Sequence, residues 1–128
     1  MIAVKKIAGK GRGIITTEDI TQGTLLEVAP VVVFPVEERA VVDKTELSKY
    51  YFVRSIEYAE SKSVKGYIIF GLASLCNHRE EPNSYVEWIE NEVGVWSHLI
   101  AKKEIKEGEE VTMFYTNIDE YYDAKKFV

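Results

Sequence analysis

The chain has 128 residues, of which 46% are hydrophobic and 29% are charged, as in an ordinary globular protein. We therefore expect one domain spanning residues 1–128 and exclude intrinsic disorder as a description of the whole chain. The net charge of −5 gives no general attraction to phosphate backbones, so direct nucleic-acid binding is not expected.

The sequence shows no recognisable targeting signal and has one cysteine, and both observations favour a soluble intracellular protein. The first seven residues lack the basic stretch and apolar run of a signal peptide. The longest apolar stretch, residues 28–36, is interrupted by two prolines and is far shorter than the roughly 20 residues that span a bilayer. A single cysteine, Cys76, can form neither an internal disulfide nor a cysteine-based zinc site. We expect a cytoplasmic location, no membrane contact and no metal.

Residue types and glycine spacing predict a mainly β protein with few short helices, because valine, isoleucine, threonine and tyrosine dominate long stretches. The expected strands, in chain order, are Ile2–Ile7, Gly13–Thr17, Leu25–Phe34, Tyr67–Phe70, Tyr85–Glu90, Val93–Ala101 and Val111–Phe114. Asn91 and Glu92, followed by Gly94, predict a hairpin turn, since asparagine tolerates the left-handed conformation that such turns require.

A short pattern occurs twice, at an offset of 85 residues: an acidic residue, isoleucine, two residues, glycine, two residues and an apolar residue. The isoleucines are Ile20 and Ile105, and the glycines are Gly23 and Gly108. We expect each copy to end a strand, dock its isoleucine on the core and turn the chain at its glycine.

The segments between and after these copies differ from the rest. Residues 37–65 are polar and are predicted to be an inserted variable segment, in which residues 43–46 offer an N-cap and a first-turn acid for a short helix. Residues 116–128 form a short C-terminal tail whose apolar residues fall near one helical face, and we expect the tail to pack back on the body.

Most standard catalytic patterns are absent. Gly11-Arg12-Gly13 lacks the third glycine of a dinucleotide fingerprint, and no phosphate-binding loop occurs. The triplet is either a plain hairpin turn or a place where a ligand approaches the backbone. Cys76 and the two histidines do not have the spacing of a metal motif, and Cys76 is more typical of a small buried residue than of a nucleophile.

Two further segments carry polar groups that need partners. In the first, an apolar run leads into Asn77 and His78, and Pro82 and Asn83 close the loop. Such side chains either brace turns or address a polar ligand. In the second, Gly108 precedes a strand that ends at Tyr115, which is either a core residue or part of a shared pocket.

Together these segments resemble the SET-domain family of S-adenosylmethionine-dependent protein-lysine methyltransferases. The resemblance covers nearly the whole chain and rests on Lys10-Gly11-Arg12-Gly13-Ile14, on Asn77-His78 with Pro82-Asn83, and on Gly108-Glu109-Glu110-Val111-Thr112 through Tyr115. It looks most like the small stand-alone viral and bacterial members, which lack cysteine-rich zinc modules. The implied fold has several small curved sheets, with a C-terminal pseudoknot that brings residues 77–78 beside Tyr115.

The resemblance also implies roles for individual residues. S-adenosylmethionine would be the cofactor, and Tyr115 would be the catalytic residue that orients the methyl group and the incoming amine. An aromatic residue of the inserted segment, Tyr50, with Tyr51 as its rival, would wall the lysine channel together with Met113. The residues that would bind the cofactor are Gly11, Arg12, Gly13, Asn77, His78 and Tyr115.

The implied reaction is methylation of lysine side chains in a protein substrate, for which a histone-like basic tail would suit the acidic charge. Arg79, Met113 and Thr116 depart from the usual family residues at their positions, which leaves activity and the number of methyl groups open. The alternative is a degenerate SET fold that binds peptides without turnover. A viral origin would place the protein in the host nucleus. The apolar segment 31–34 would allow a homodimer if its edge were exposed, although burial in the core is the favoured explanation of its apolar character.

Overall fold

The structure is a computed structural model that describes residues 1–118 and residue 120. The strands of this part of the chain are β1 (Ile2–Ile7), β2 (Gly11–Thr16), β3 (Leu25–Phe34), β4 (Tyr51–Phe52), β5 (Gly66–Ile69), β6 (Asn77–His78), β7 (Ser84–Asn91), β8 (Gly94–Ala101) and β9 (Glu110–Met113). The short helices are α1 (Arg39–Val42) and α2 (Ser55–Tyr58), with 3-10 turns η1 (Val36–Glu38), η2 (Glu46–Lys49) and η3 (Leu72–Leu75). The predicted mainly β fold with few short helices is confirmed.

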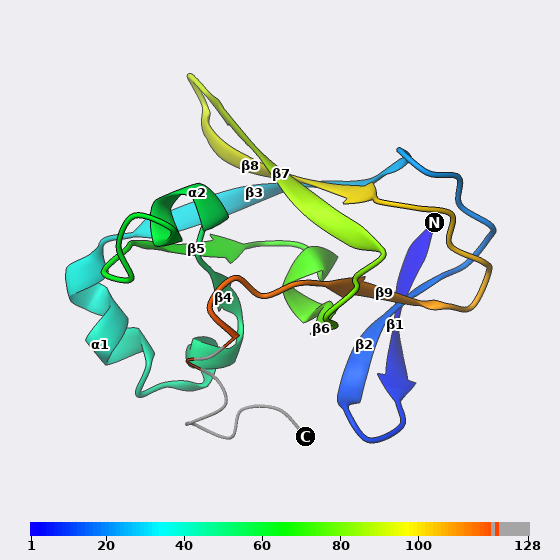
Figure 1. Ribbon diagram of the computed structural model, residues 1–128, viewed down its shortest axis with the longest axis horizontal. Coiled ribbons are helices and arrows are strands. Elements are labelled where there is room, and N and C mark those ends of the chain that lie inside the picture. The colour runs from blue at the N-terminus through cyan, green and yellow to red at the C-terminus, as the bar shows by residue number, and fades with distance from the viewer. Residues whose placement is uncertain (119, 121–128) are drawn as a thin grey trace.

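The strands form two sheets, with the orders β1-β2-β9-β6 and β4-β5-β3-β8-β7 (Figure 1). All seven expected strands are present, and their ends lie within two residues of the predicted ends. The sequence did not predict β4 and β6, because a strand of two residues leaves no alternation of polar and apolar side chains to detect. β6 is nevertheless one of the segments that build the site described below.

The repeated pattern forms a reciprocal pair. Ile20 and Ile105 form an antiparallel bridge in which each backbone N–H donates to the other residue's carbonyl, at 2.8 and 3.0 Å. Gly23 N donates to Ala101 O at 2.8 Å, and the equivalent Gly108 N donates to Thr16 O at 2.9 Å. Both glycines have a positive φ and both isoleucines are buried, as the pattern predicts.

The predicted inserted segment, residues 37–65, contains α1, α2 and β4, and β4 adds to the five-stranded sheet beside β5. In Figure 1, α1, α2 and β4 lie at the far end of β3 and β5 from the N-terminal hairpin. Thr45 caps η2 by accepting a hydrogen bond from Leu47 N at 3.2 Å, and Glu46 is the first-turn acid, as predicted. A second hydrophobic cluster has Phe34, Tyr51, Val53 and Val64 at its centre.

Strand β3 occupies the centre of its sheet, between β5 and β8. Within residues 31–34, however, only Val31 is paired on both sides, because β8 pairs with residues 25–31 and β5 with residues 31–34. A homodimer through this segment stays a prediction. Phe34 is 5% exposed and belongs to the second cluster, whereas Val32 on the same strand is 46% exposed.

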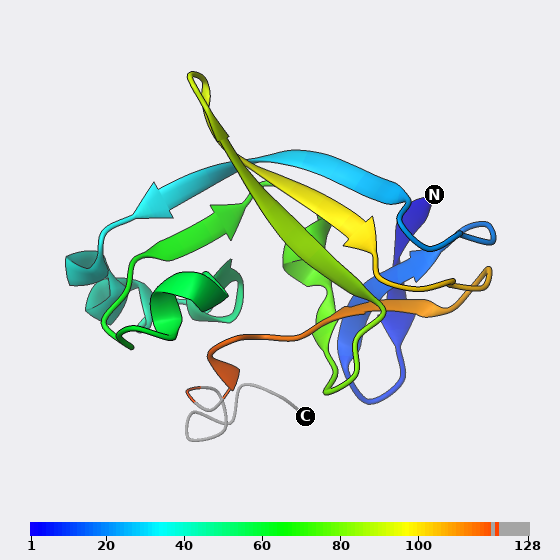
Figure 2. The same ribbon diagram turned by 45° about the horizontal axis from the view of Figure 1, so that its top comes forward.

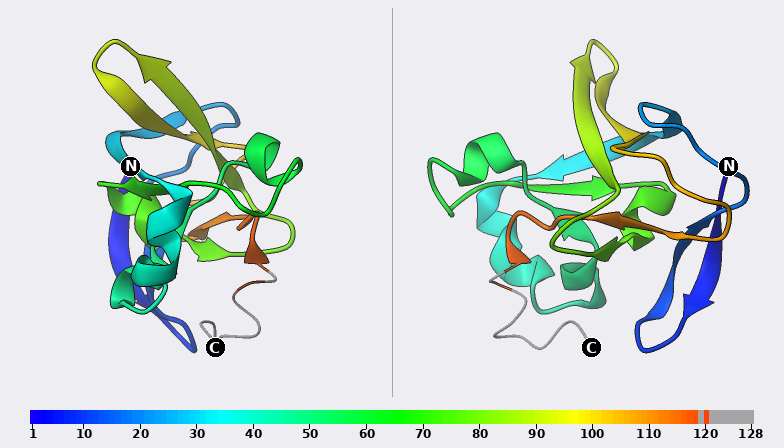
Figure 3. Two further views of the ribbon diagram at one scale, coloured as in Figure 1. Left: turned by 90° about the vertical axis from the view of Figure 1, so that its left-hand side faces the viewer. Right: turned by 45° about the vertical axis from the view of Figure 1, so that its right-hand side comes forward.

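The β7–β8 hairpin extends away from the rest of the molecule in both views of Figure 3. Its turn is the predicted one, and Asn91 pairs with Gly94 across it. Asn91 contributes through its side chain, because its Oδ1 accepts from Val93 N at 2.9 Å, while the positive φ belongs to Gly94. The left-handed residue is thus the glycine rather than the asparagine.

Most of the predicted C-terminal tail, residue 119 and residues 121–128, lies outside the described residues. Within residues 116–118, Ile118 packs against the main core. None of the helices in the described part of the chain has the length and apolar character needed to cross a membrane.

Candidate functional site

Three segments that are distant in the sequence meet around β9. This strand pairs with β2 on one side and, in parallel, with β6 on the other (Figure 2). Asn77 lies opposite Thr112, and His78 lies opposite Met113. β9 thus lies between the N-terminal hairpin and the segment after residue 76, as the predicted pseudoknot requires.

The first part of the site is a close approach of backbone and side chains at Gly13. A Cβ at this position would lie 2.7 Å from Asn77 Nδ2 and 2.9 Å from Glu110 Oε2, so any larger residue would displace these two side chains. Asn77 Nδ2 donates to Arg12 O at 3.3 Å and to Glu110 Oε2 at 2.6 Å. The amide of Asn77 therefore ties β2 to β9. The hairpin turn itself precedes the glycine triplet, because β2 already begins at Gly11.

The charges around this approach differ in sign and exposure. The Glu110 side chain is 13% exposed, and its second oxygen lies 3.7 Å from Lys10 Nζ. Arg12 is exposed on the same strand as Gly13. A largely buried carboxylate and two cations that reach solvent thus surround the backbone of residues 10–13, where they would complement a ligand with both charges.

His78 holds the segment that follows β9. Its Nδ1 accepts a hydrogen bond from Tyr115 N at 2.9 Å, and its ring lies 5.4 Å from the Tyr115 ring and 4.9 Å from the Phe114 ring. Burial lowers the pKa of His78 below its ordinary value, and Lys10 acts in the same direction, while Glu80 opposes them. A neutral imidazole is the form that accepts at Nδ1, so burial and hydrogen bonding favour the same state.

Tyr115 is 7% exposed and donates its phenol hydroxyl to Cys76 O at 2.5 Å. Phe52 packs edge-on against its ring, with a centroid distance of 5.7 Å and an interplanar angle of 83°. Cys76 is fully buried, and burial raises the pKa of its thiol, with added effects from Glu27 and Glu110. The thiol is therefore protonated and inert, which fits the prediction of a small buried residue.

Asn83 helps to hold β9 in place. The sequence motif contains this residue, but no role was predicted for it. Its side chain donates to Glu110 O at 2.8 Å and accepts from Thr112 N at 2.9 Å. Ser84 Oγ donates to Thr112 O at 2.6 Å. These hydrogen bonds hold β9 to the loop that precedes β7. Because Asn83 and Ser84 are both buried, breaking the bonds would leave buried polar groups without partners.

A pocket of about 360 Å³ lies beside the segment that contains Tyr115, although Tyr115 itself is not among its lining residues. The residues on either side of Tyr115 in the chain, Phe114 and Thr116, belong to its wall, together with Met113. The remaining lining is mostly apolar and comes from β4 and the residues that lead into α2, from β7 and the loop before it, and from the residue after β8: Phe52, Val53, Ser55, Pro82, Ser84, Tyr85, Val86, Trp88 and Lys102.

The predicted site residues are thus placed unequally around this pocket. Met113 lines it, whereas Tyr50 lies at the end of η2 and is not among its lining residues. Tyr51 is buried and hydrogen-bonded in the inserted segment, and the aromatic ring that reaches Tyr115 is Phe52. A channel role for Tyr50 stays a prediction.

Sequence reasoning missed the contributions of Glu110 and Phe52. Glu110 lies in the last motif and Phe52 directly follows Tyr51, but neither residue had a signal in the sequence that separated it from its neighbours. Among the described residues, no group of three or more histidine, cysteine, aspartate or glutamate side chains could hold a metal ion.

Comparison with known proteins gives the family. A family model described as SET domain matches residues 11–116. A histone-lysine N-methyltransferase of Schizosaccharomyces pombe, named as specific for H3 lysine-37, is 28% identical over 89% of this chain and 72% of its own length. A second, of Yarrowia lipolytica and named as specific for H3 lysine-36, is 33% identical over 88% of this chain, but the chain spans only 15% of that relative.

Solved structures show the same fold. A candidate histone methyltransferase of Plasmodium falciparum superposes with a TM-score of 0.68 at 24% identity, over 90% of this chain and 96% of that one. CpSET8 from Cryptosporidium superposes with a TM-score of 0.65 at 23% identity, over 89% of this chain and 56% of that one. The family match and the names of the two relatives support the predicted enzyme class, protein-lysine methyltransferase. The chain belongs to the SET domain family.

Proposed function

We propose that this protein transfers a methyl group from S-adenosylmethionine to a lysine side chain of a protein substrate. The observation that carries the proposal is the position of Tyr115, which is hydrogen-bonded to His78 and is flanked in the chain by two lining residues of a mostly apolar pocket, Phe114 and Thr116. Tyr115 is buried, and its backbone N–H, its hydroxyl and its ring each have a partner: His78, the Cys76 carbonyl and Phe52. Methyl transfer needs such fixed alignment more than it needs acid–base groups.

The chemistry of the residues around Gly13 fits the amino-acid end of the cofactor. Its ammonium group would suit the Glu110 carboxylate, and its carboxylate would suit Arg12 and Lys10. The missing side chain at Gly13 lets Asn77 and Glu110 lie close to the backbone of β2, while Gly11 and Arg12 beside it are exposed to a ligand. His78 and Phe114, whose rings are in contact, would provide the apolar surface for the adenine. Bound there, the cofactor would supply an electrophilic methyl group on a sulfonium.

The pocket suits the lysine side chain. Its hydrocarbon stem would contact Phe52, Trp88 and Met113, and aromatic faces also attract the amine when it is charged. The Tyr115 hydroxyl hydrogen points at Cys76 O, so its oxygen would act toward an amine as an acceptor. Accepting one amine hydrogen would orient the nitrogen lone pair, and the buried surroundings would exclude water from the reaction.

We further propose that the substrate is a basic protein segment. The relatives are named as enzymes for histone H3, and the net charge of −5 would draw a lysine-rich partner toward this chain. An intracellular location belongs to the same proposal, because such substrates occur there.

Calorimetric titration with S-adenosylmethionine, followed by methyl transfer to histone H3 and to lysine-rich peptides, tests the proposal. We expect saturable binding and mass increases of one or more methyl groups on lysine. A control peptide with every lysine replaced by arginine should remain unmodified. Binding without transfer would favour the alternative of a peptide-binding module, and the absence of binding would contradict the cofactor assignment.

A further inference from the structure

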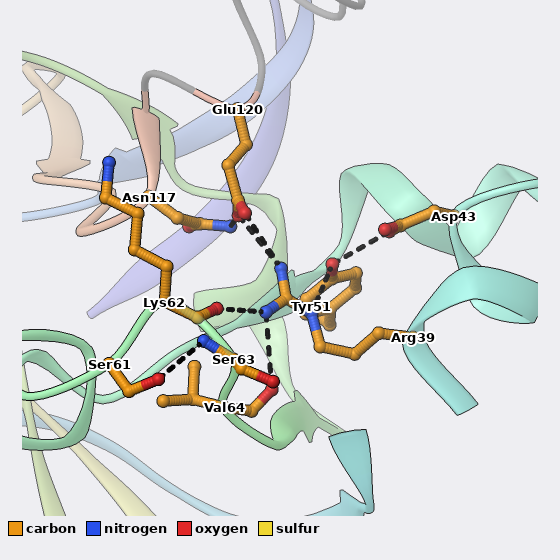
Figure 4. Close-up of polar contacts among 9 residues, drawn as sticks. All are labelled: Arg39, Asp43, Tyr51, Ser61, Lys62, Ser63, Val64, Asn117 and Glu120. Atoms are coloured by element: carbon orange, nitrogen blue, oxygen red, sulfur yellow. Dashed lines mark hydrogen bonds and ion pairs between the residues drawn. The ribbon is translucent and has the colours of Figure 1, made fainter. Parts of the chain in front are cut away.

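Arg39, in the inserted segment, is a buried cation that contacts three other parts of the chain. It is 8% exposed, although it lies on a short surface helix. Its Nε donates to the Tyr51 hydroxyl at 3.2 Å, and its Nη1 donates to Lys62 O at 3.1 Å and Val64 O at 3.3 Å. Its Nη2 donates to both carboxylate oxygens of Glu120, at 2.9 and 3.2 Å (Figure 4). We call these side chains and carbonyls the Arg39 network.

All three guanidinium nitrogens are thus used, and that explains why the charge is tolerated inside the protein. Burial alone would lower the pKa of Arg39, but Tyr51 and Glu120 outweigh this effect and raise it. Burial and the hydrogen bond to Asp43 raise the pKa of Tyr51 to about 12, so its hydroxyl stays protonated. Tyr51 then donates to Asp43 Oδ1 at 2.7 Å while it accepts from Arg39.

One arm of the network leads to the pocket through β4. Tyr51 is followed directly by Phe52, and β4 consists of these two residues alone. Phe52 lines the pocket and packs edge-on against Tyr115. Because so short a strand has few backbone contacts of its own, the hydrogen bonds of the Tyr51 hydroxyl help to set where Phe52 lies.

The other arm leads to the segment after Tyr115. Asn117, which is 3% exposed, donates from Nδ2 to Glu120 Oε1 at 2.7 Å. Ile118 N donates to Tyr115 O, and Glu120 N donates to Asn117 O, both at 3.0 Å. Figure 4 shows Asn117 and Glu120 together on the opposite side of the guanidinium from Asp43. Arg39 therefore holds both the wall against which Tyr115 packs and the turn that continues from it.

We propose that Arg39 is a positioning residue for methyl transfer, which sets the Tyr115–Phe52 geometry from the inserted segment and the C-terminal turn at once. The inference rests on the proposed function. It predicts that the network acts on the rate of the reaction as well as on stability, since small displacements of an aligning group lower transfer rates strongly.

Replacement of Arg39 itself would leave several buried acceptors without a donor and is expected to impair folding. The test therefore uses Glu120→Ala, Glu120→Gln and Tyr51→Phe in the full chain. Glu120→Gln keeps the shape and an acceptor but removes the charge, and Tyr51→Phe keeps the ring but removes the bridging hydroxyl. The matched control is Glu46→Ala, which breaks an exposed 3.1 Å ion pair with Lys49 in the same inserted segment.

Single-turnover transfer to a lysine peptide is measured at saturating cofactor and peptide, well below each melting temperature, and is normalised to the folded fraction. We expect the rate to fall roughly 10- to 100-fold in Glu120→Ala and Tyr51→Phe, and less in Glu120→Gln. The Kd for cofactor should stay within about twofold of wild type, since no network residue lies at Gly13 or Glu110. The Glu46→Ala control should keep the wild-type rate.

Wild-type rates per folded molecule in Glu120→Ala and Tyr51→Phe, with only the melting temperature lowered, would show a purely structural network and overturn the proposal. An inactive wild-type protein would refute the proposed function instead. In that case hydrogen–deuterium exchange decides the positioning role. Exchange at residues 50–53 and 115–118 should be faster in Glu120→Ala than in Glu46→Ala, and equal exchange would overturn the proposal.

Discussion

Replacing Tyr115 by phenylalanine removes one oxygen atom and tests the centre of the proposed site. The ring should stay in place, because Phe52 still packs against it at 5.7 Å and the backbone bond to His78 is kept. What is lost is the hydroxyl bond to Cys76 O, a buried contact. Its removal should lower the free energy of unfolding by about 1 kcal/mol, or up to about 3 kcal/mol if the carbonyl finds no other donor.

The effect on chemistry should be larger than the effect on folding. If the phenol oxygen aligns the amine with the methyl group, its loss should lower the single-turnover rate roughly 10- to 1000-fold, while the Kd for cofactor changes much less. The assay is methyl transfer to a lysine peptide at saturating S-adenosylmethionine, with a melting curve on the same sample.

A matched variant separates catalysis from stability. Tyr67 is 1% exposed and donates its hydroxyl to Glu57 at 2.9 and 3.1 Å, so Tyr67→Phe also removes a phenol bond of a buried tyrosine, although this bond is only partly buried. Tyr67→Phe should show a comparable loss of stability and a wild-type rate. A wild-type rate per folded molecule in Tyr115→Phe would refute the catalytic role and leave Tyr115 as a core residue.

Three further outcomes follow from the site. Asn77→Ala removes the amide that donates to Glu110, and we expect cofactor affinity per folded molecule to fall at least about tenfold. Calorimetric titration measures the cofactor affinity. An unchanged affinity with a lower melting temperature would show that Asn77 only stabilises the fold. His78 has a pKa below its ordinary value, so the unfolded state binds this proton at a higher pH than the folded state does, and the melting temperature should fall as the pH drops below about 6.5. His78→Asn should lose that component of the pH dependence and His98→Gln should keep it, whereas equal curves would contradict the assignment. The Cys76 thiol should not react with an aromatic disulfide reagent at pH 8 until the protein unfolds, and rapid labelling of the native protein would contradict its burial.

The sequence predicted the parts of the fold that have a local signal. Strands such as β1 and β3 alternate or concentrate β-branched residues over six to ten positions, and their ends were predicted to the residue. The repeated pattern predicted two equivalent turns because glycine at a positive φ has few substitutes. That the two isoleucines pair with each other has no local signal, since it depends on how distant segments meet.

The candidate site was likewise predictable only where its residues have a local signal in the sequence. The segments containing Asn77, His78 and Tyr115 were recognised from motif residues, and the structure brings them together. The aromatic wall was placed at Tyr50 or Tyr51, one or two residues before the ring that contacts Tyr115. With three aromatic residues in succession, only the pairing of β4 with β5 decides which ring faces the pocket. The burial of Arg39 was equally hidden, because a charged residue in a polar segment predicts exposure.

The reciprocal pairing of Ile20 with Ile105 also bears on when the molecule becomes complete during synthesis. The N-terminal hairpin is made first, yet its Thr16 carbonyl accepts from Gly108 N, and Gly13 is contacted by Glu110, both in the last quarter of the chain. Contacts of such long sequence separation require a costly loop closure before they contribute, so they form late and slow the folding reaction. The residues proposed to hold the cofactor would therefore meet only after the ribosome has released β9, and a chain that stops before this strand would expose an unpaired β2 edge to other proteins.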